Sequence, residues 1–212
     1  MTTLTPLILI GAGGHACSLL DTLIGHELRG LLSEDKAQWG ERVLGVKVLG
    51  GDEVLATLNP ADVKLVNAVG SAGKTTARRD VFERCKERGF TFAAVTHPSA
   101  VLSPNATLGE GVQLLANSYV GPQAQLGNNV LVNTGAVLEH DCHVCAHVHI
   151  APNATLLGGV RVGVGSHIGA GATVLQNVAI GERCVIGAGA VVLHSVETGQ
   201  TVVGVPAAPI QQ

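Results

Sequence analysis

The stretch from Val101 to Val196 decides the fold, because it divides without a slip into sixteen units of six residues. In order, the units are VLSPNA, TLGEGV, QLLANS, YVGPQA, QLGNNV, LVNTGA, VLEHDC, HVCAHV, HIAPNA, TLLGGV, RVGVGS, HIGAGA, TVLQNV, AIGERC, VIGAGA and VVLHSV. The second residue is always Leu, Val or Ile, and the sixth is always Ala, Val, Ser or Cys. This period predicts short strands joined by tight turns and wound three to a coil. Stacked at about 4.8 Å, the coils would form a prism about five coils high.

The residues before this repeat have a different character. Of the 29 charged residues, 22 lie in residues 1–96 and 7 in residues 97–212. Apolar runs alternate there with segments of helical spacing. The predicted strands are 7–10, 28–32, 63–69 and 90–96, and the predicted helices are 16–23 and 75–88. We therefore expect an α/β domain with a small parallel sheet at 1–96 and the prism at 97–212.

The composition excludes several classes of protein. With 46% hydrophobic residues and a mean hydropathy of +0.37, the chain is not disordered. Thirteen Lys and Arg against sixteen Asp and Glu, with 2% aromatic residues, argue against a nucleic-acid partner. Residues 1–10 lack the basic start of a secretory signal, and no apolar run approaches the roughly 20 residues of a membrane span. Five scattered cysteines favour free thiols, so we expect a cytoplasmic protein without a membrane partner.

The candidate catalytic pair is His140 with Asp141. The interior positions of the repeat are apolar, so an ionisable side chain must lie on a corner or an outer face. His140 holds the fourth position of its unit and should point outward. A neighbouring carboxylate can fix the tautomer of an imidazole and make it a better general base. The alternative is a solvated surface histidine.

Cys142, His143, Cys145, His147 and His149 form a run of residue types that bind metals. The repeat places a corner between the two cysteines, so their thiols would not meet at one point. Each thiol is expected to be a small buried hydrophobic group. We therefore expect no metal. A zinc site of three histidines shared between subunits is the rival interpretation.

A glycine-rich turn, Gly11 to Ala16, follows the first predicted strand and opens a helix. It matches G-x-G-x-x-A, and Glu34 and Asp35 follow about 20 residues later. Backbone N–H groups at a helix N-terminus suit a pyrophosphate. Residues 1–96 are too few for the usual two-half dinucleotide fold, which favours a shorter diphosphate such as a nucleotide sugar. The alternative is a tight turn without a ligand.

Four features together resemble one family: the GAGGHA turn at 11–16, the THPSA segment at 96–100, the outward His140–Asp141 pair and the VGVPA segment at 203–207. The chain resembles the sugar-nucleotide N-acetyltransferases of bacterial glycan synthesis, of the UDP-4-amino-sugar (bacillosamine) and GDP-perosamine types, and the related sialic acid O-acetyltransferases. The resemblance implies a Rossmann-like α/β domain followed by a left-handed parallel β-helix. It also implies acetyl-CoA as co-substrate and a homotrimer with active sites between subunits.

The resemblance assigns roles to single residues. It implies that His140 is the general base and that Asp141 tunes it. The residues that it assigns to the sugar nucleotide are Gly13, Gly14, His15, Glu34, Asp35, Gly70 and Asn133. The residues that it assigns to acetyl-CoA are His149, Ala170 and Ala188. Ser33 stands where the family often has an acid near the base and ribose, so the identity of the nucleotide stays open.

We therefore expect an acetyl-CoA-dependent N-acetyltransferase that acts on the amino group of a UDP-, dTDP- or GDP-linked 4-amino-deoxy sugar. His140 would take the amine proton and pass it to the CoA thiolate, without a metal. Three alternatives remain open. They are O-acetylation of sialic acid or a related sugar, a zinc lyase like the γ-class carbonic anhydrases, and a scaffold that keeps the nucleotide-sugar domain without catalysis.

Overall fold

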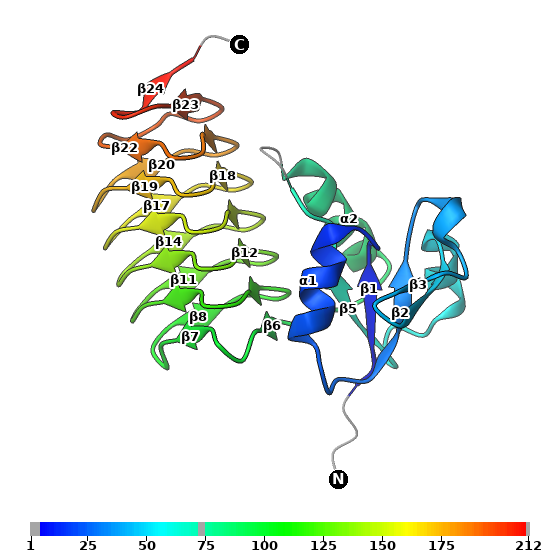
Figure 1. Ribbon diagram of the computed structural model, residues 1–212. Helices are drawn as coiled ribbons and strands as arrows, with labels where there is room; N and C mark the ends of the chain where they lie inside the picture. Colours follow the sequence, from blue (N-terminus) through cyan, green and yellow to red (C-terminus); the bar gives the residue numbers. More distant parts are fainter. Residues whose placement is uncertain (1–4, 72–74, 211–212) are drawn as a thin grey trace.

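An α/β unit and a left-handed parallel β-helix lie side by side in the computed structural model, which describes residues 5–71 and 75–210 (Figure 1). Both halves of the predicted fold are confirmed. Residues 1–4, part of the segment in which we expect no secretory signal, lie outside the described residues.

The α/β unit is built on a five-stranded sheet with the order β3-β4-β2-β1-β5. Its strands are β1 (Leu7–Ile10), β2 (Leu28–Leu32), β3 (Arg42–Val43), β4 (Val46–Gly50) and β5 (Lys64–Asn67). All neighbouring pairs are parallel except β3 and β4, which form an antiparallel hairpin at one edge. This hairpin was not among the predicted strands.

Two α-helices and two short 3-10 helices connect these strands. They are α1 (Gly14–Thr22), α2 (Thr76–Glu87), η1 (Lys36–Gln38) and η2 (Asp52–Thr57). Helix α1 lies between the sheet and the β-helix (Figure 1). Its buried Ala16 and Leu19 share an apolar cluster with Leu115 and Leu131 of the β-helix. The two units are therefore joined by a common core.

The β-helix has three faces, each a sheet of short strands. Face I contains β7 (Val101–Leu102), β10 (Tyr119–Val120), β13 (Val137–Leu138), β16 (Thr155–Leu156), β19 (Thr173–Val174) and β22 (Val191–Val192). Face II contains β8 (Thr107–Leu108), β11 (Gln125–Leu126), β14 (His143–Val144), β17 (Arg161–Val162) and β20 (Ala179–Ile180). Face III contains β6 (Val95–Thr96), β9 (Gln113–Leu114), β12 (Leu131–Val132), β15 (His149–Ile150), β18 (His167–Ile168), β21 (Val185–Ile186), β23 (Thr201–Val203) and β24 (Ala208–Pro209).

The interior of the β-helix follows the six-residue pattern. Second positions such as Leu138 and Ile150 and sixth positions such as Ala136 and Cys142 are fully buried. The fifth position has a positive φ in fourteen consecutive units, from Gly111 to Gly189. Glycine and asparagine tolerate this left-handed conformation best, and they occupy most of these positions. The repeat therefore encodes both the core and the corners.

The predicted strand at 90–96 is wrong in one respect, because its two ends belong to different sheets. Phe92 forms a bridge with Leu65 beside β5. Val95 and Thr96 instead pair with β9 on face III. The segment FTFAAVT contains no turn residue, so its sequence gives no sign that its hydrogen-bonding partner changes. Pairing within the β-helix thus begins one short strand before residue 97.

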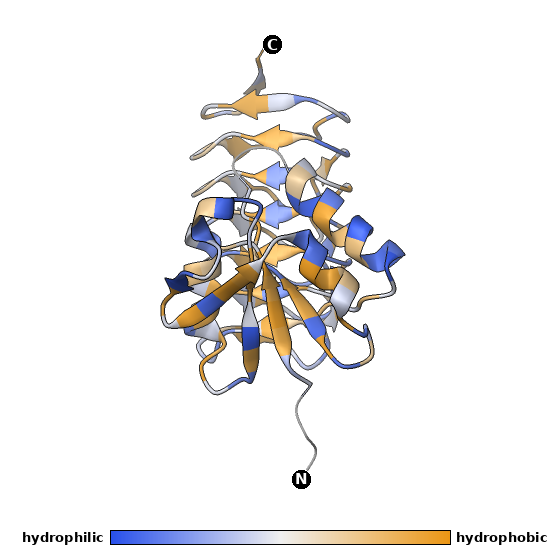
Figure 2. Cartoon of the chain, turned by 90° about the vertical axis from the view of Figure 1, so that its right-hand side faces the viewer, coloured by the Kyte–Doolittle hydropathy of each residue, from blue (hydrophilic) through white to orange (hydrophobic). Residues whose placement is uncertain are grey.

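The apolar residues lie mainly on the strands, whereas the outer side of α2 is polar (Figure 2). None of the helices within residues 5–71 and 75–210 has the length and apolar character that a membrane span requires. All five cysteines are free thiols.

Ile168 offers a test of the stacked core, because its side chain is fully buried inside the β-helix. We expect Ile168→Ala to lower the free energy of unfolding in urea by about 2–5 kcal/mol, because the lost methyl groups leave a cavity. The control Ile24→Ala removes an exposed side chain and should change it by no more than about 0.5 kcal/mol. Equal stabilities of the two variants would contradict this account of the core.

Candidate functional site

His140 and Asp141 form a pair on the corner between faces I and II. The Nδ1 atom of His140 lies 2.7 Å from Oδ2 of Asp141. An ionised carboxylate only accepts hydrogen bonds, so Nδ1 is the ring nitrogen that donates to it, and in the neutral imidazole Nε2 carries the lone pair. The His140 side chain is 61% exposed, which confirms its outward orientation. The Nε2 lone pair is therefore available to a substrate.

A hollow of about 500 Å³ surrounds this pair. Of the described residues, only residues of this corner line it: Glu139, His140, Asp141, Leu157, Gly158, Gly159, Gln176 and Asn177. A Cβ atom at Gly158 would lie 2.6 Å from Cε1 and Nε2 of His140. Gly158 therefore makes room for the imidazole, a role that its place exactly one coil above His140 could have suggested.

The glycine-rich turn forms the N-terminus of α1. Gly13 is its N-cap residue, and the bond from Cys17 N–H to the Gly13 carbonyl is 3.3 Å long. The backbone N–H groups at the start of α1 have no acceptor within the helix and can donate hydrogen bonds to an anion. A Cβ atom at Gly13 or Gly14 would meet no atom of the described residues within 4 Å. These glycines leave open space in front of the helix.

His15 points from this turn toward the β-helix. Its Nε2 lies 2.9 Å from Oε1 of Gln113, whose own Nε2 donates to the carbonyl of Asn67. The Gln113 oxygen is thus the acceptor, and His15 donates through Nε2. Burial, with a smaller contribution from the charge of Arg78, lowers the pKa of His15 to about 4. Gly70 lies against His15, since a Cβ there would be 3.4 Å from the His15 Cβ.

His149 lies on face III and bridges the two units. Its Nδ1 is 2.6 Å from the Ser71 hydroxyl, and its Nε2 is 3.1 Å from the amide nitrogen of Asn133. The amide nitrogen can only donate, so Nε2 accepts and Nδ1 carries the proton. Burial, followed by the neighbouring His167 and Arg78, lowers the pKa of His149 to about 3. His149 is therefore a neutral, fixed imidazole.

Ala170 and Ala188 lie above Asn133 on the corner between faces III and I. Both are exposed, and they lie on adjacent coils, where the N–H of Gly189 donates to the Ala170 carbonyl. The structure thus brings Asn133, His149 and the Gly70 loop together, with both alanines along the same corner. It does not bring His140 and Asp141 close to these residues. Within the described residues, no hydrogen bond or ion pair joins that pair to the α/β unit.

A pocket of about 410 Å³ opens at the carboxyl ends of β1, β2 and β5. Strand order reverses between β1 and β5, which is where α/β sheets bind their ligands. The polar residues lining it are Ser33, Glu34, Asp35, Asp52, Asp80 and Arg84. The Asp35 carboxylate also accepts the N–H of Ala37 and so caps η1. Both predicted acids therefore border a pocket at the expected edge.

Buried polar groups lie between the two units, and they were not among the predicted site residues. The Arg78 side chain is buried, and its Nη1 donates to the carbonyls of Asn67 and Val69. Burial lowers the pKa of Arg78 to about 9. Asn67 also bonds to Asn129, which in turn contacts His147. One usable signal was the set of polar first positions on face III, namely Gln113, His149 and His167, which are 36 and 18 residues apart.

The run from Cys142 to His149 does not gather at one point. Cys142 is buried, and burial raises the pKa of its thiol to about 11. His143 is exposed on face II, whereas His147 is buried against α2, near Glu83. Among the described residues, no group of three or more His, Cys, Asp or Glu side chains is arranged to hold a metal ion.

Two family models match the chain. Residues 6–85 match the PglD N-terminal domain, and residues 123–158 and 159–194 match the bacterial transferase hexapeptide repeat. The acetyltransferase domain of PglB from Neisseria gonorrhoeae FA1090 is 35% identical over 97% of this chain and 100% of that chain, with a TM-score of 0.89. PerB from Caulobacter crescentus, solved with CoA and GDP-perosamine, is 34% identical over 97% of each chain, also with a TM-score of 0.89. WeeI from Acinetobacter baumannii AYE, 24% identical over 96% of this chain and 99% of that chain with a TM-score of 0.84, shares the fold.

The neutral histidines predict an acid-sensitive fold. In an unfolded chain, histidine side chains bind protons near pH 6.5, whereas the folded-state pKa values of His15 and His149 are about 4 and 3. The contribution of these two histidines to the free energy of unfolding is therefore fully present above about pH 6.5. It is lost as the pH drops toward the folded-state pKa values. As the pH falls from 6.5 to 5, we expect each of these histidines to lower the free energy of unfolding by about 1–2 kcal/mol.

Urea unfolding at several pH values checks this dependence. His149→Gln should flatten it, whereas His143→Gln, which changes an exposed histidine, should leave the wild-type slope. Identical slopes for wild type and His149→Gln would show that His149 is not held neutral.

Proposed function

The chain belongs to the family of PglD-like hexapeptide-repeat acetyltransferases, and we propose that it transfers the acetyl group of acetyl-CoA to the amino group of a nucleotide-linked 4-amino-deoxy sugar. The observation that carries the proposal is the outward His140–Asp141 pair beside an open hollow. The complex of PerB with CoA and GDP-perosamine supports the choice of both substrates.

The proposed reaction needs one base. The amine nitrogen attacks the thioester carbonyl, the C–N bond forms and the C–S bond breaks. Nε2 of His140 takes the proton lost by the amine and delivers it to the leaving CoA thiolate. Asp141 holds Nδ1–H and stabilises the imidazolium that forms between these two transfers.

We assign the two substrates to different parts of the chain. In this proposal, residues 1–96 bind the sugar nucleotide, with Gly13, Gly14, His15 and Gly70 around the diphosphate and Glu34 and Asp35 near the nucleoside. Residues 97–212 bind acetyl-CoA, with Ala170 and Ala188 beside the pantetheine arm and His149 near the thioester. Asn133 lies next to His149 and is assigned to the sugar.

The site proposed here takes residues from two subunits. His140 lies on the corner between faces I and II, whereas Asn133 and His149 lie on or beside face III. Face I, between these corners, carries half-buried first-position residues such as Tyr119, Val137 and Val191. Packing this face against a neighbouring chain would bring His140 of one subunit to Asn133 of the next. A homotrimer in the cytoplasm, where the five free thiols stay reduced, fits this arrangement.

Substitution of the base tests the reaction. Thiol release from acetyl-CoA is measured with UDP-, dTDP- and GDP-linked 4-amino sugars, with free sialic acid alongside. We expect turnover on one amino sugar, and His140→Ala should lower kcat/KM by at least about 100-fold because the proton acceptor is lost. His143→Ala, on the exposed face II, is the control and should keep wild-type activity. Turnover indifferent to His140, or confined to the sialic acid hydroxyl, would refute the proposed reaction.

Mixed oligomers test the shared site. His140→Ala and Asn133→Ala chains should each be inactive alone. Co-refolded in equal amounts, they should recover about a quarter of the wild-type activity, since one random interface in four joins two intact halves. If both residues served a site within one chain, the mixture would stay inactive.

A further inference from the structure

The loop after β2 holds an aromatic side chain in a fixed orientation. The indole Nε1–H of Trp39 donates to the carbonyl of Ser33 at 2.8 Å. The Ser33 hydroxyl donates to Oε1 of Gln38 at 2.7 Å and accepts the N–H of Asp35 at 3.1 Å. Ser33, found where an acid was expected, thus organises the loop that carries Trp39.

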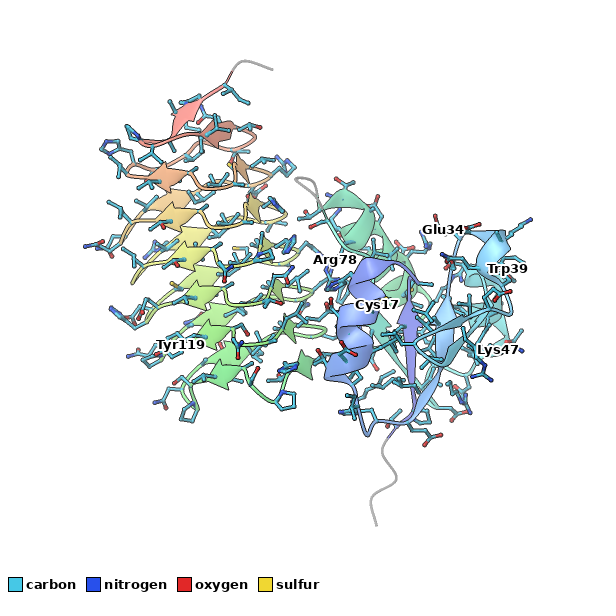
Figure 3. All side chains as sticks on the ribbon, in the orientation of Figure 1. Cys17, Glu34, Trp39, Lys47, Arg78 and Tyr119 are labelled. Carbon is cyan, nitrogen blue, oxygen red and sulfur yellow. The ribbon has the colours of Figure 1, made fainter. Side chains whose placement is uncertain are left out.

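The Trp39 ring is supported on one side and remains partly open. A Cβ atom at Gly51 would lie 3.1 Å from Cζ2 of Trp39, so the edge of the ring packs against that glycine. The Lys36 ammonium lies 5.7 Å from the ring centroid. The residue is nevertheless 38% exposed. It lies beside Glu34, on the side of the α/β unit away from the β-helix (Figure 3).

Trp39 lines a hollow of about 420 Å³ that adjoins the pocket at the strand ends. The two hollows share Glu34, Asp52 and Arg84 as walls. Arg84 forms an ion pair with Asp52 and lies 4.0 Å from Glu34. A ligand that starts at the N-terminus of α1 and crosses the first pocket would therefore reach the indole next.

We propose that Trp39 is the surface on which the nucleobase of the sugar nucleotide stacks. The inference rests on the proposed function, because that function places a nucleoside diphosphate in the first pocket. With the diphosphate at α1 and the ribose beside the acids, the base extends into the second hollow. An immobilised indole stacks on a base at little entropic cost, and every base presents a π-face.

The competing explanation is that Trp39 only covers Gly51. In that case a large aliphatic side chain would serve as well as an aromatic one. Stacking, by contrast, requires a ring. The matched variants are therefore Trp39→Phe, which keeps a ring, and Trp39→Leu, which keeps only apolar cover.

Trp39 is the one tryptophan in the sequence, so its fluorescence reports on this position in the unmodified protein. Wild-type protein is titrated with GDP, UDP and dTDP, and with inorganic pyrophosphate as the probe without a base. We expect a nucleoside diphosphate to quench the fluorescence and pyrophosphate to leave it unchanged. Equal responses to the nucleotide and to pyrophosphate would overturn the inference.

Calorimetry on the variants measures how much the indole contributes to nucleotide affinity. For the nucleotide that binds wild type, Trp39→Leu should raise the Kd about 5- to 150-fold, the range found when a stacking side chain is removed. Trp39→Phe should stay close to wild type, and acetyl-CoA should bind all three proteins equally, which controls for folding. Wild-type nucleotide affinity in Trp39→Leu would overturn the inference.

These outcomes separate the inference from the proposed function. Quenching by a nucleotide without any acetyl transfer would refute the function and leave the stacking role intact. Acetyl transfer that is indifferent to Trp39→Leu in both kcat and KM would refute the stacking role alone.

Discussion

The stacking of identical coils constrains every other feature of this molecule. Strands pair with strands 18 residues away, as between Val120 and Leu138, so each unit must repeat its corner at the same place. The fifth position must then adopt a left-handed conformation, including at Asp141. The same geometry places His140 outside, directly below Gly158 of the next coil. The candidate base is thus positioned by the period itself.

Face III imposes a second constraint, because the α/β unit covers it. Side chains that would be solvated on a free face, such as Gln113 and His149, become buried there. Burial in turn requires hydrogen-bond partners, which Asn67 and Ser71 of the α/β unit supply. The cost of charging a buried imidazole keeps His15 and His149 neutral at physiological pH. The docking of the units therefore sets the chemistry of the residues assigned to substrate binding.

The two constraints separate the candidate site into halves. The period fixes His140 on one corner, while the docking fixes Asn133 and His149 near another. The β-helix core lies between these two corners of one chain. Catalysis at a joint site would thus depend on a neighbouring subunit. The pocket at the strand ends, in contrast, is lined by residues of the α/β unit alone.

The amino-acid sequence was enough to predict the β-helix, its corners, the outward His140–Asp141 pair and the glycine-rich turn, because each depends on residues close together in the chain. It also placed Glu34 and Asp35 directly after the second predicted strand. The structure was needed to show which outer face is covered, that residues 90–96 divide between two sheets, and that Arg78 lies buried between the units. It likewise showed that Trp39 packs against Gly51 in a hollow beside the pocket at the strand ends. These features depend on contacts between segments far apart in the chain, and neither periodicity nor a local motif records such contacts.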